Sequence, residues 1–375
     1  MGNCVRGRGA PGLAKKGGAE MELGARLRAA RLAARLSQRG LAQQVGVTHA
    51  AISKYERGLD MPSLGVLGRL SRALGVTTEY FFRTFEAQVE LKAARHAAKL
   101  GARDMKAVAA RVAEQLERYM AAEHVCPSCI HEDKASPPPS WTVASVEEIE
   151  AVARDLRSDW QLGDNPIQSM TELLERQGIR IVEIKGIKRL DAQLFWANAT
   201  DLAIAVNGEH PGDRQRFSLA HELGHLVLQV IGNIDPEKAA NRFAGAFLVP
   251  RSVAVGMLGR RRSALELREL HLLKHAYGFS MQAWVYRAKD LGIVSESLYG
   301  RWYREFRRAH GTHEPGKPYP QEHPAQAKRL VMQAYAEGTV TASRAAELLG
   351  ESLGAFRKQL RETGDDQTAD CGHGC

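Results

Sequence analysis

The sequence predicts a mainly α-helical protein with a small β-sheet, an α+β fold. Apolar residues recur with helical spacing over most of the 375 residues, and three short β-rich runs lie together between residues 179 and 206. Glycine, proline and helix-capping residues divide the helical regions into short segments. The length allows about two or three domains, and 44% hydrophobic with 25% charged residues is the composition of a globular protein.

Composition excludes membrane and secreted proteins. No apolar run approaches the roughly 18–20 residues of a membrane span, and the first residues lack the apolar core of a secretory signal. We expect residues 1–20 to form a flexible tail. Five cysteines, an odd number without a secretory signal, indicate a reducing cytoplasm and argue against a disulfide framework.

The positive charge is concentrated at the N-terminal end. The chain has 52 Lys and Arg against 43 Asp and Glu, and residues 1–82 alone hold 13 against 5. Nearly all of the positive surplus therefore lies in this region. A polyanion such as double-stranded DNA is the partner that this distribution favours.

Residues 21–82 are predicted to form a bundle of five short helices. Gly46 ends one helix, and Thr48 is a suitable N-cap for the next, which Gly58 closes. Ser63 is placed to begin another helix. Two short helices joined by a turn that contains glycine, within a basic domain, are typical of a helix-turn-helix.

Residues 83–140 are predicted to be a helical linker that ends at a proline-rich boundary. Residues 83–122 are rich in Ala, Arg, Lys and Glu, and three prolines follow at 137–139. Before the prolines, Cys126 and Cys129 form a CxxC pattern between two histidines. A structural zinc site normally uses two such knuckles, so a second metal or redox site is an alternative to a reduced, solvated linker.

Residues 141–300 are predicted to form the α+β core. Helices are expected at 147–156 and 169–177, strands at 179–184, 192–196 and 202–206, and helices again from 213 to about 292. Residues 301–375 are predicted to be a helical appendage with a linker at 310–318 and a flexible tail. Within this appendage, residues 340–360 have the spacing of a small second helix-turn-helix, for which a simple packing role is the favoured alternative.

The run FSLAHELGHLVLQ at 217–229 places three costly polar side chains in one turn of an apolar helix. Residues four apart share a helix face, so His221 and His225 can direct both imidazoles at one ion. Glu222 can then reach a water bound to that ion, whose pKa zinc lowers towards about 7, and act as general base. The alternative is a helix whose histidines are only hydrogen-bonded.

A third protein ligand is expected, because catalytic zinc usually has three and keeps one position open. Asp235 and Pro236 predict the start of a helix, which places Glu237 in its first turn. Asn241, four residues further on, shares that face and suits the orientation of a ligand histidine. The sequence therefore predicts Zn²⁺ held by the histidine pair and Glu237.

The run LAHELGHLVLQ, followed by ExxANRFAGAFLVP, resembles the ImmA/IrrE family of metallo-endopeptidases. The resemblance covers residues 165–290 and implies a thermolysin-like zincin core. It implies three zinc ligands, His221, His225 and Glu237, and Glu222 as the catalytic base.

The resemblance does not identify the group that stabilises the transition state. His275 and Tyr277 are candidates, and an ordinary packed or surface side chain is the alternative for both. The substrate that the family implies is another protein, such as a DNA-bound repressor.

Residues 22–80 resemble the XRE (Cro/C1-type) helix-turn-helix in the pattern SQxxLAxxVGVxxxxISxYERGxxxP. The resemblance implies double-stranded DNA as a partner. Gln38, at a helix start, is expected to meet phosphate. The residues expected over the major groove are Thr48, His49, Ala50 and Lys54. A protein-binding helix-turn-helix is the alternative, and the weak binding of a single head favours a homodimer or a second contact.

Together these features predict a cytoplasmic transcriptional regulator with a DNA-binding head and a zinc-dependent endopeptidase domain. Its predicted reaction is peptide-bond hydrolysis in a repressor-type protein, within a stress or mobile-element response. The alternative is a non-proteolytic regulator or antitoxin whose peptidase-like domain senses a ligand or binds a partner such as a toxin. An intact Glu222 beside the ligands favours the enzyme, because a binding-only domain has no use for the base.

Overall fold

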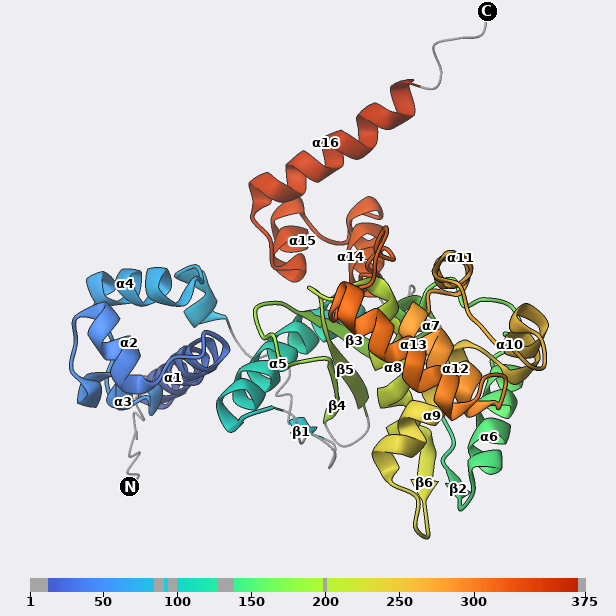
Figure 1. Cartoon of the computed structure of the whole chain (residues 1–375). Helices are drawn as coiled ribbons and strands as arrows, with labels where there is room; N and C mark the ends of the chain where they lie inside the picture. Colours follow the sequence, from blue (N-terminus) through green and yellow to red (C-terminus); the bar gives the residue numbers. More distant parts are fainter. Residues whose placement is uncertain (1–12, 84–90, 94–99, 127–137, 198–200, 370–375) are drawn as a thin grey trace, which may run out of the picture. The chain divides into compact units, whose positions relative to one another are not determined.

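The computed structural model confirms a mainly α-helical protein with small β-sheets (Figure 1). It describes residues 13–83, 91–93, 100–126, 138–197 and 201–369. The chain forms two compact units. The first comprises residues 1–89 and 100–117, and the second comprises residues 90–99 and 118–375.

The first unit is a bundle of short helices. Its elements are α1 (Leu13–Ala33), α2 (Gln38–Val45), α3 (His49–Glu56), α4 (Leu64–Leu74), the 3-10 helix η1 (Glu79–Phe82) and the first part of α5 (Ala102–Val125). The side chains of Ser37, Thr48 and Ser63 cap α2, α3 and α4, because each accepts a hydrogen bond from a backbone N–H in the first turn. The expected five-helix bundle over residues 21–82 is thus four α-helices and one 3-10 helix.

The core of this bundle holds α2 and α3 at a fixed angle. Leu27 of α1, Leu41 of α2 and Ile52 of α3 are completely buried in one hydrophobic cluster. Gly24 of α1 allows a close approach to α3, since a Cβ there would lie 2.5 Å from the carbonyl oxygen of Tyr55. A larger residue at position 24 would therefore push α1 away from α3.

The structure of residues 83–140 differs in two ways from the helical linker that the sequence predicts. Residues Leu91–Ala93 form a strand, β1, and not a helix. The first part of α5 also packs with the bundle, where Glu117 pairs with Arg26 at 2.5 Å and Arg111 donates to the carbonyl oxygen of Ala33. Composition does not predict these contacts, since it indicates only that residues 83–122 continue as a helical connector.

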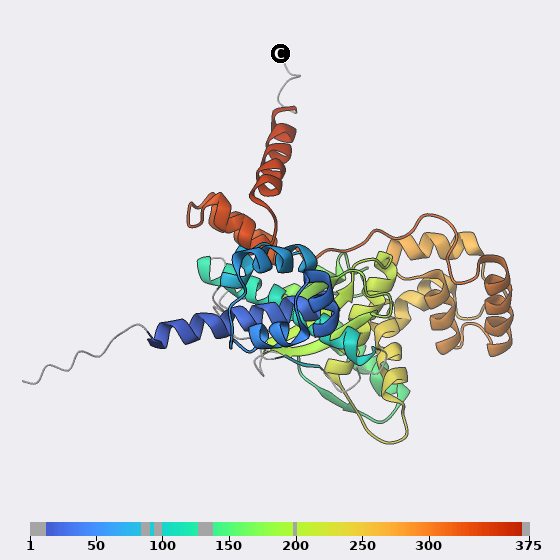
Figure 2. The same ribbon diagram turned by 90° about the vertical axis from the view of Figure 1, so that its left-hand side faces the viewer.

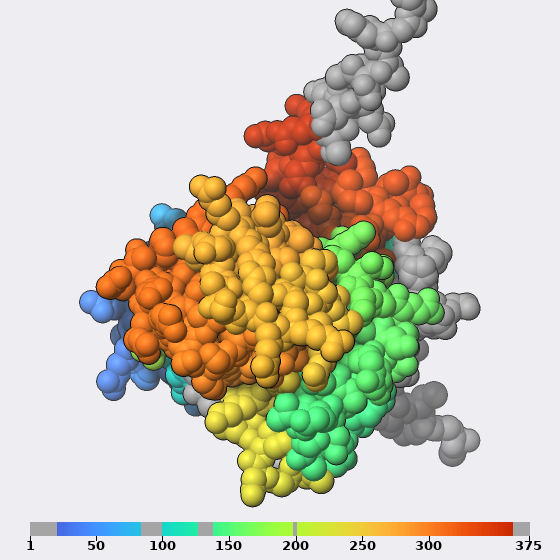
Figure 3. Space-filling model, turned by 45° about the vertical axis from the view of Figure 1, so that its right-hand side comes forward, coloured from blue at the N-terminus to red at the C-terminus, as the bar shows by residue number. Residues whose placement is uncertain are grey.

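The second unit contains the sheets and the remaining helices. Its elements are β1, the end of α5, β2 (Trp141–Val143), α6 (Val146–Asp159), α7 (Met170–Arg176), β3 (Ile179–Ile184), β4 (Ala192–Ala197), β5 (Asp201–Asn207), α8 (Gly212–Val227), β6 (Leu228–Val230), α9 (Pro236–Leu248), α10 (Arg251–Leu258), α11 (Leu267–Tyr277), α12 (Met281–Asp290), α13 (Glu296–His310), α14 (Gln326–Ala336), α15 (Ala342–Leu349) and α16 (Leu353–Ala369). Figure 3 shows α10 to α13 as one continuous face beside α6.

The main sheet has the strand order β1-β4-β5-β3. β4 is antiparallel to β1 and to β5, and β3 is parallel to β5. The three strands expected at 179–184, 192–196 and 202–206 are confirmed within a residue or two. β2 and β6 form a separate parallel pair, with Trp141 opposite Leu228.

α8 crosses this unit between the sheet and α9. It contacts β4 and β5 on one side and α9 on the other. Leu219, Leu223 and Val227, one helical step apart, are completely buried in the core. Residues on other faces of α8 are therefore free to carry polar groups without leaving the core unfilled.

The segment 311–325, here called the strap, packs along the second unit. Glu322 pairs with the buried Arg216 at 2.6 Å and accepts from the N–H of Thr171. Glu314 and Asp213 pair with the Lys274 ammonium at 2.9 and 3.0 Å; burial opposes its charge, but the two carboxylates hold the pKa of Lys274 above its usual value. The linker predicted at 310–318 is therefore held against the second unit, although most of its residues are exposed.

The boundary predicted at residue 300 falls inside α13, so it is displaced. Leu298 and Trp302 of α13 both pack against the main core. After the strap, α14 to α16 form a small cluster with the end of α5, in which Val331, Ala345 and Phe356 are at most 1% exposed. Within the described residues, no helix has the length and apolarity needed to cross a membrane.

Candidate metal centre

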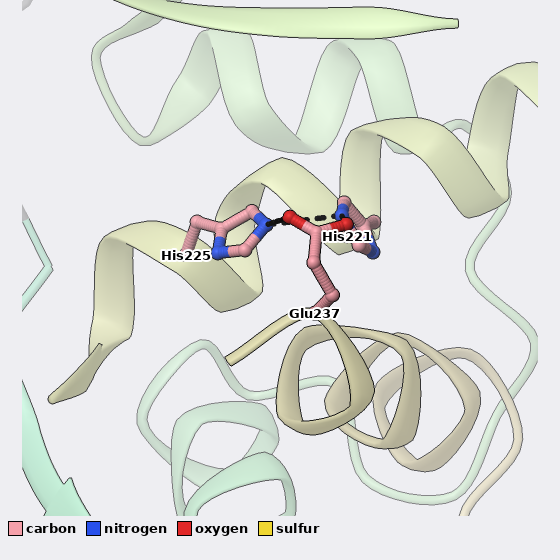
Figure 4. A group of neighbouring side chains, drawn as sticks. All are labelled: His221, His225 and Glu237. Atoms are coloured by element: carbon pink, nitrogen blue, oxygen red, sulfur yellow. Dashed lines mark hydrogen bonds and ion pairs between the residues drawn. The ribbon is translucent and has the colours of Figure 1, made fainter. Parts of the chain in front are cut away.

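Two helices bring the candidate ligands together. α8 supplies His221 and His225, which lie one helical step apart, and α9 supplies Glu237 from its first turn (Figure 4). The Asp235 carboxylate caps α9 by accepting from the N–H groups of Glu237 and Lys238, and Pro236 occupies the first helical position. The start of α9 is therefore fixed beside α8.

Gly224 allows the two helices to approach closely. A Cβ at this position would lie 3.1 Å from Cα of Ala240 and from the ring of Phe243. Because Gly224 precedes His225 directly, the close packing occurs at the ligand turn itself. A side chain at position 224 would force α9, and Glu237 with it, away from the histidines.

The three polar side chains converge on one point. The Nε2 atoms of His221 and His225 are 3.0 Å apart, and oxygens of Glu237 lie 3.1 Å from His225 Nε2 and 3.6 Å from His221 Nε2. Four-coordinate zinc with bonds of about 2.0–2.1 Å spaces neighbouring ligand atoms about 3.3 Å apart. The three side chains therefore form a cluster that could hold a metal ion, with ligand atoms that all lie within 4.8 Å of one another.

The donor set fits a divalent zinc ion. Oδ1 of Asn241 lies 3.0 Å from His221 Nδ1, and an amide oxygen can only accept. Nδ1 of His221 therefore carries the proton, which leaves the Nε2 lone pair directed at Glu237. Two imidazoles and one carboxylate with an oriented histidine are the protein ligands typical of catalytic zinc.

The cluster is buried on the histidine side and open on the glutamate side. The side chain of His225 is 5% exposed, that of His221 13% and that of Glu237 42%. Solvent or a substrate can therefore reach the ligands from the α9 side. An imidazole pair this close, and this little hydrated, is satisfied better by a cation than by bulk water.

Glu222 lies next to the ligands and also contacts the sheet. Its Oε2 accepts a hydrogen bond of 2.9 Å from the N–H of Leu194 in β4. No local pattern predicts this bond, because Leu194 lies 28 residues away in an apolar strand. It fixes one carboxylate oxygen, so the orientation of the candidate base depends on β4 as well as on α8.

We expect the Asn241→Ala protein to bind zinc about 10–100-fold more weakly, because His221 loses the acceptor that sets its tautomer. The purified wild type should hold one zinc per chain. Affinity is measured by competition with a chromophoric chelator. Asn233→Ala, in the exposed turn before α9, is the matched control and should bind zinc as the wild type does; equal affinity of both variants would contradict the role of Asn241.

The two candidate transition-state stabilisers have other contacts. His275 Nε2 lies 3.1 Å from the carbonyl oxygen of Lys317 in the strap. Tyr277 is 7% exposed and packs edge-on against Trp284 in the core. These contacts support the packed-side-chain alternative for both residues.

The predicted DNA-contacting residues come from the start of α2 and from the N-cap and first two turns of α3. Thr48, His49, Ala50 and Lys54 are exposed. Gln38 instead turns towards the bundle and donates to Glu56 at 2.7 Å, next to the Arg31–Glu56 ion pair. Its side chain is thus engaged within the bundle, and the contact to phosphate remains a prediction.

The CxxC pattern is only partly described. Cys126 is 2% exposed at the end of α5 and is disulfide-bonded, whereas the odd number of cysteines predicts reduced thiols. Cys129 lies outside the described residues, so a second metal or redox site stays a prediction.

Two family models match the chain. Residues 27–81 match a helix-turn-helix model, and residues 174–289 match the peptidase M78 model, described as the IrrE N-terminal-like domain. The second match runs from α7 to α12 and contains the whole cluster. The chain carries an XRE-type helix-turn-helix and an IrrE-like domain. The IrrE-like domain has a metallopeptidase-like fold.

Curated relatives match less than a fifth of the chain. An "uncharacterized transcriptional regulator in ATPase CF(0) region" of Rhodospirillum rubrum is 39% identical over 67 residues, which is 18% of this chain and 62% of the relative. The "SPbeta prophage-derived uncharacterized HTH-type transcriptional regulator YonR" of Bacillus subtilis is 37% identical over 68 residues, 18% of this chain and 63% of the relative. The chain thus spans less than two thirds of either relative.

The crystal structure of ComR from Streptococcus suis is among the solved structures that match this chain. The alignment covers 91% of this chain and 95% of the ComR chain, with 8% sequence identity and a TM-score of 0.16. At this TM-score the likeness carries no argument about fold or function.

Proposed function

We propose that the protein is a cytoplasmic DNA-binding regulator whose IrrE-like domain is a zinc-dependent endopeptidase. The observation that carries the proposal is the convergence of His221, His225 and Glu237, with Glu222 beside them. A binding-only domain needs the buried core but not this arrangement. The substrate that we propose is a protein, specifically a repressor of helix-turn-helix type.

The proposed reaction is hydrolysis of a peptide bond. A zinc ion bound at the cluster would polarise the scissile carbonyl and lower the pKa of a water towards about 7. Glu222 takes a proton from the attacking water as its oxygen bonds to the carbonyl carbon. Glu222 then delivers this proton to the amine nitrogen as the C–N bond breaks, so the products are a carboxylic acid and an amine.

The DNA-binding head provides the location for this activity. The exposed side chains of α3 and the basic surplus of residues 1–82 support DNA as its ligand. DNA as ligand also supports an intracellular location. If the substrate is bound to the same DNA, the head raises its effective concentration at the peptidase. A single head binds weakly, so we include a homodimer in the proposal.

The test in cells is a search for new protein N-termini. Mass spectrometry compares cells that express the wild type with cells that express His225→Ala, which lacks a buried ligand. Under the proposal, wild-type cells contain cleaved fragments of one or a few DNA-binding proteins that the variant cells lack. Identical sets of N-termini, with both proteins folded and equally abundant, would contradict the endopeptidase.

The second candidate function is regulation without proteolysis, in which the domain senses a ligand or binds a partner such as a toxin. The observation that favours it is the bond between Glu222 and Leu194, which engages one oxygen of the base with the sheet. In that case the transcriptional effects of the protein survive the loss of the base.

We expect Lys54→Ala to weaken binding to duplex DNA and to lower the slope of log K against log salt by about one, as for the loss of one phosphate contact. Lys54 is exposed on α3. Fluorescence anisotropy with a mixed-sequence 30-bp duplex measures both quantities, where the length is chosen to exceed about two turns of DNA. Lys106→Ala, also exposed in the first unit, removes the same charge and should have little effect.

A further inference from the structure

The C-terminal helices α15 and α16 repeat the local structure of the helix-turn-helix formed by α2 and α3. In both pairs an eight-residue helix ends at a glycine, and one residue separates the glycine from the cap of the next helix. The two pairs superimpose in sequence with a constant offset of 304 residues. Both matched family regions end before α14.

The caps and the turn correspond residue by residue. Thr341 caps α15 through the N–H of Arg344, as Ser37 caps α2 through the N–H of Gly40. Gly350 has φ 71 and ψ 26 where Gly46 has φ 70 and ψ 42, the left-handed conformation that favours glycine.

The residue after each glycine donates an equivalent backbone hydrogen bond to the preceding helix. The N–H of Glu351 donates to Ala346 at 3.0 Å, as that of Val47 donates to Ala42 at 3.0 Å. Ser352 then caps the next helix through the N–H of Ala355. The angle between the two helices of a pair is set by this turn, so the pairs share one supersecondary structure.

The buried positions correspond as well. Ala345 and Phe356 occupy the places of Leu41 and Ile52, and all four are at most 1% exposed. Phe356 packs edge-on against Tyr335 of α14, with ring centroids 5.4 Å apart. The end of α5 covers the same apolar side of the cluster. The opposite side of α16 is therefore its solvent face.

The solvent face of α16 carries small and basic residues, and one acidic residue, Glu362, pairs there with Lys358 at 3.6 Å. Gly354 and Ala355 are exposed in its first turn, and Arg357, Lys358 and Arg361 are exposed in the following turns. Lys358 and Arg361 stand at the positions of Lys54 and Arg57 on α3. Small residues let a helix approach the groove, and basic residues further along it meet phosphate.

We propose that α15 and α16 form a second helix-turn-helix that binds double-stranded DNA through α16. Figure 2 shows α16 projecting from α14 and α15, and Arg357, Lys358 and Arg361 are exposed on it. The chain then has two DNA-contacting elements, one on each side of the IrrE-like domain in sequence. A second contact strengthens binding by raising the effective concentration of each element at the DNA, provided both can reach the same duplex.

The first test removes the three basic residues together in the full-length protein. The variant is Arg357→Ala/Lys358→Ala/Arg361→Ala, and the matched control is Arg251→Ala/Arg260→Ala/Arg261→Ala, which removes three exposed positive charges near α10. Both are assayed with the mixed-sequence duplex across a salt series. We expect the α16 variant to bind about tenfold or more weakly and to lose about two to three units of salt slope, while the control changes little.

Two outcomes of this test would overturn the proposal. If the α16 variant binds as the wild type does, the face of α16 is solvated or meets a protein. If the control loses as much as the α16 variant, the effect is one of net charge. The same pair of variants made on a His49→Ala/Lys54→Ala background separates this proposal from the function of the N-terminal head, because the α16 effect must persist there.

The second test gives a positive signal that does not depend on loss of binding. A Cβ at Gly354 would meet only Ser352 Oγ, at 3.9 Å, so Gly354→Cys is expected to fold normally. Labelled with a photoactivatable aryl azide, it should crosslink to the duplex more than the labelled unsubstituted chain does. Gly256→Cys on α10, where a Cβ meets nothing within 4 Å, is the control. Equal crosslinking from positions 354 and 256 would contradict DNA contact by α16.

Discussion

Replacing Glu222 with Gln is expected to leave zinc bound and to slow peptide-bond hydrolysis by about 10²–10⁴-fold, the usual contribution of general acid–base catalysis. Glutamine keeps the size of the side chain, and its amide oxygen can still accept from the N–H of Leu194, a bond of 2.9 Å in the wild type. It cannot take a proton from water. Since His221, His225 and Glu237 are unchanged, the metal content should equal that of the wild type.

The measurement combines metal analysis with the hydrolysis rate of a peptide that spans the cleavage site identified in cells. Glu266→Gln, an exposed residue at the start of α11, makes the same chemical change outside the cluster and should retain full activity. A Glu222→Gln protein that hydrolyses the peptide at the wild-type rate would remove Glu222 as the base. If the transcriptional effects also survive this change, the non-proteolytic function is the better account.

Much of the fold could be predicted because its signals are local. Thr48 was predicted as the cap of α3 and Asp235 as the cap of α9, since both residues act on N–H groups two or three positions away. The strands β3, β4 and β5 were also found, because each is a run of apolar residues bounded by turns. The candidate ligands follow from the same kind of signal, a helical spacing of four.

The unpredicted parts depend on contacts between distant residues. Trp141–Val143 and Leu228–Val230 are three-residue strands with no periodicity of their own, and they pair only because folding brings them together across 87 residues. The bond from Leu194 to Glu222 has the same origin. The sequence shows which side chains are able to make such contacts, but the partner depends on tertiary structure.

The strap shows this limit most clearly. Its Pro- and Gly-rich sequence predicts a linker, since such residues usually mark exposed turns. Yet Glu314 and Glu322 are the partners of Lys274 and Arg216, which are almost completely buried. A buried arginine requires a carboxylate nearby, but nothing in the local sequence indicates that it comes from 106 residues further along the chain.

Replacing Glu322 with Gln is therefore expected to destabilise the second unit by about 3–5 kcal/mol, because Arg216 is left with an unpaired charge at 0% exposure. For a unit of this size, the midpoint of thermal unfolding should fall by about 6–20 °C. Calorimetry measures this shift. Glu347→Gln, which breaks the half-exposed pair with Arg344 at 2.9 Å, is the matched control and should cost less than about 1 kcal/mol. Equal, small shifts in the two variants would mean that the strap is held by its other contacts, and the ion pair would then have no special role in the fold.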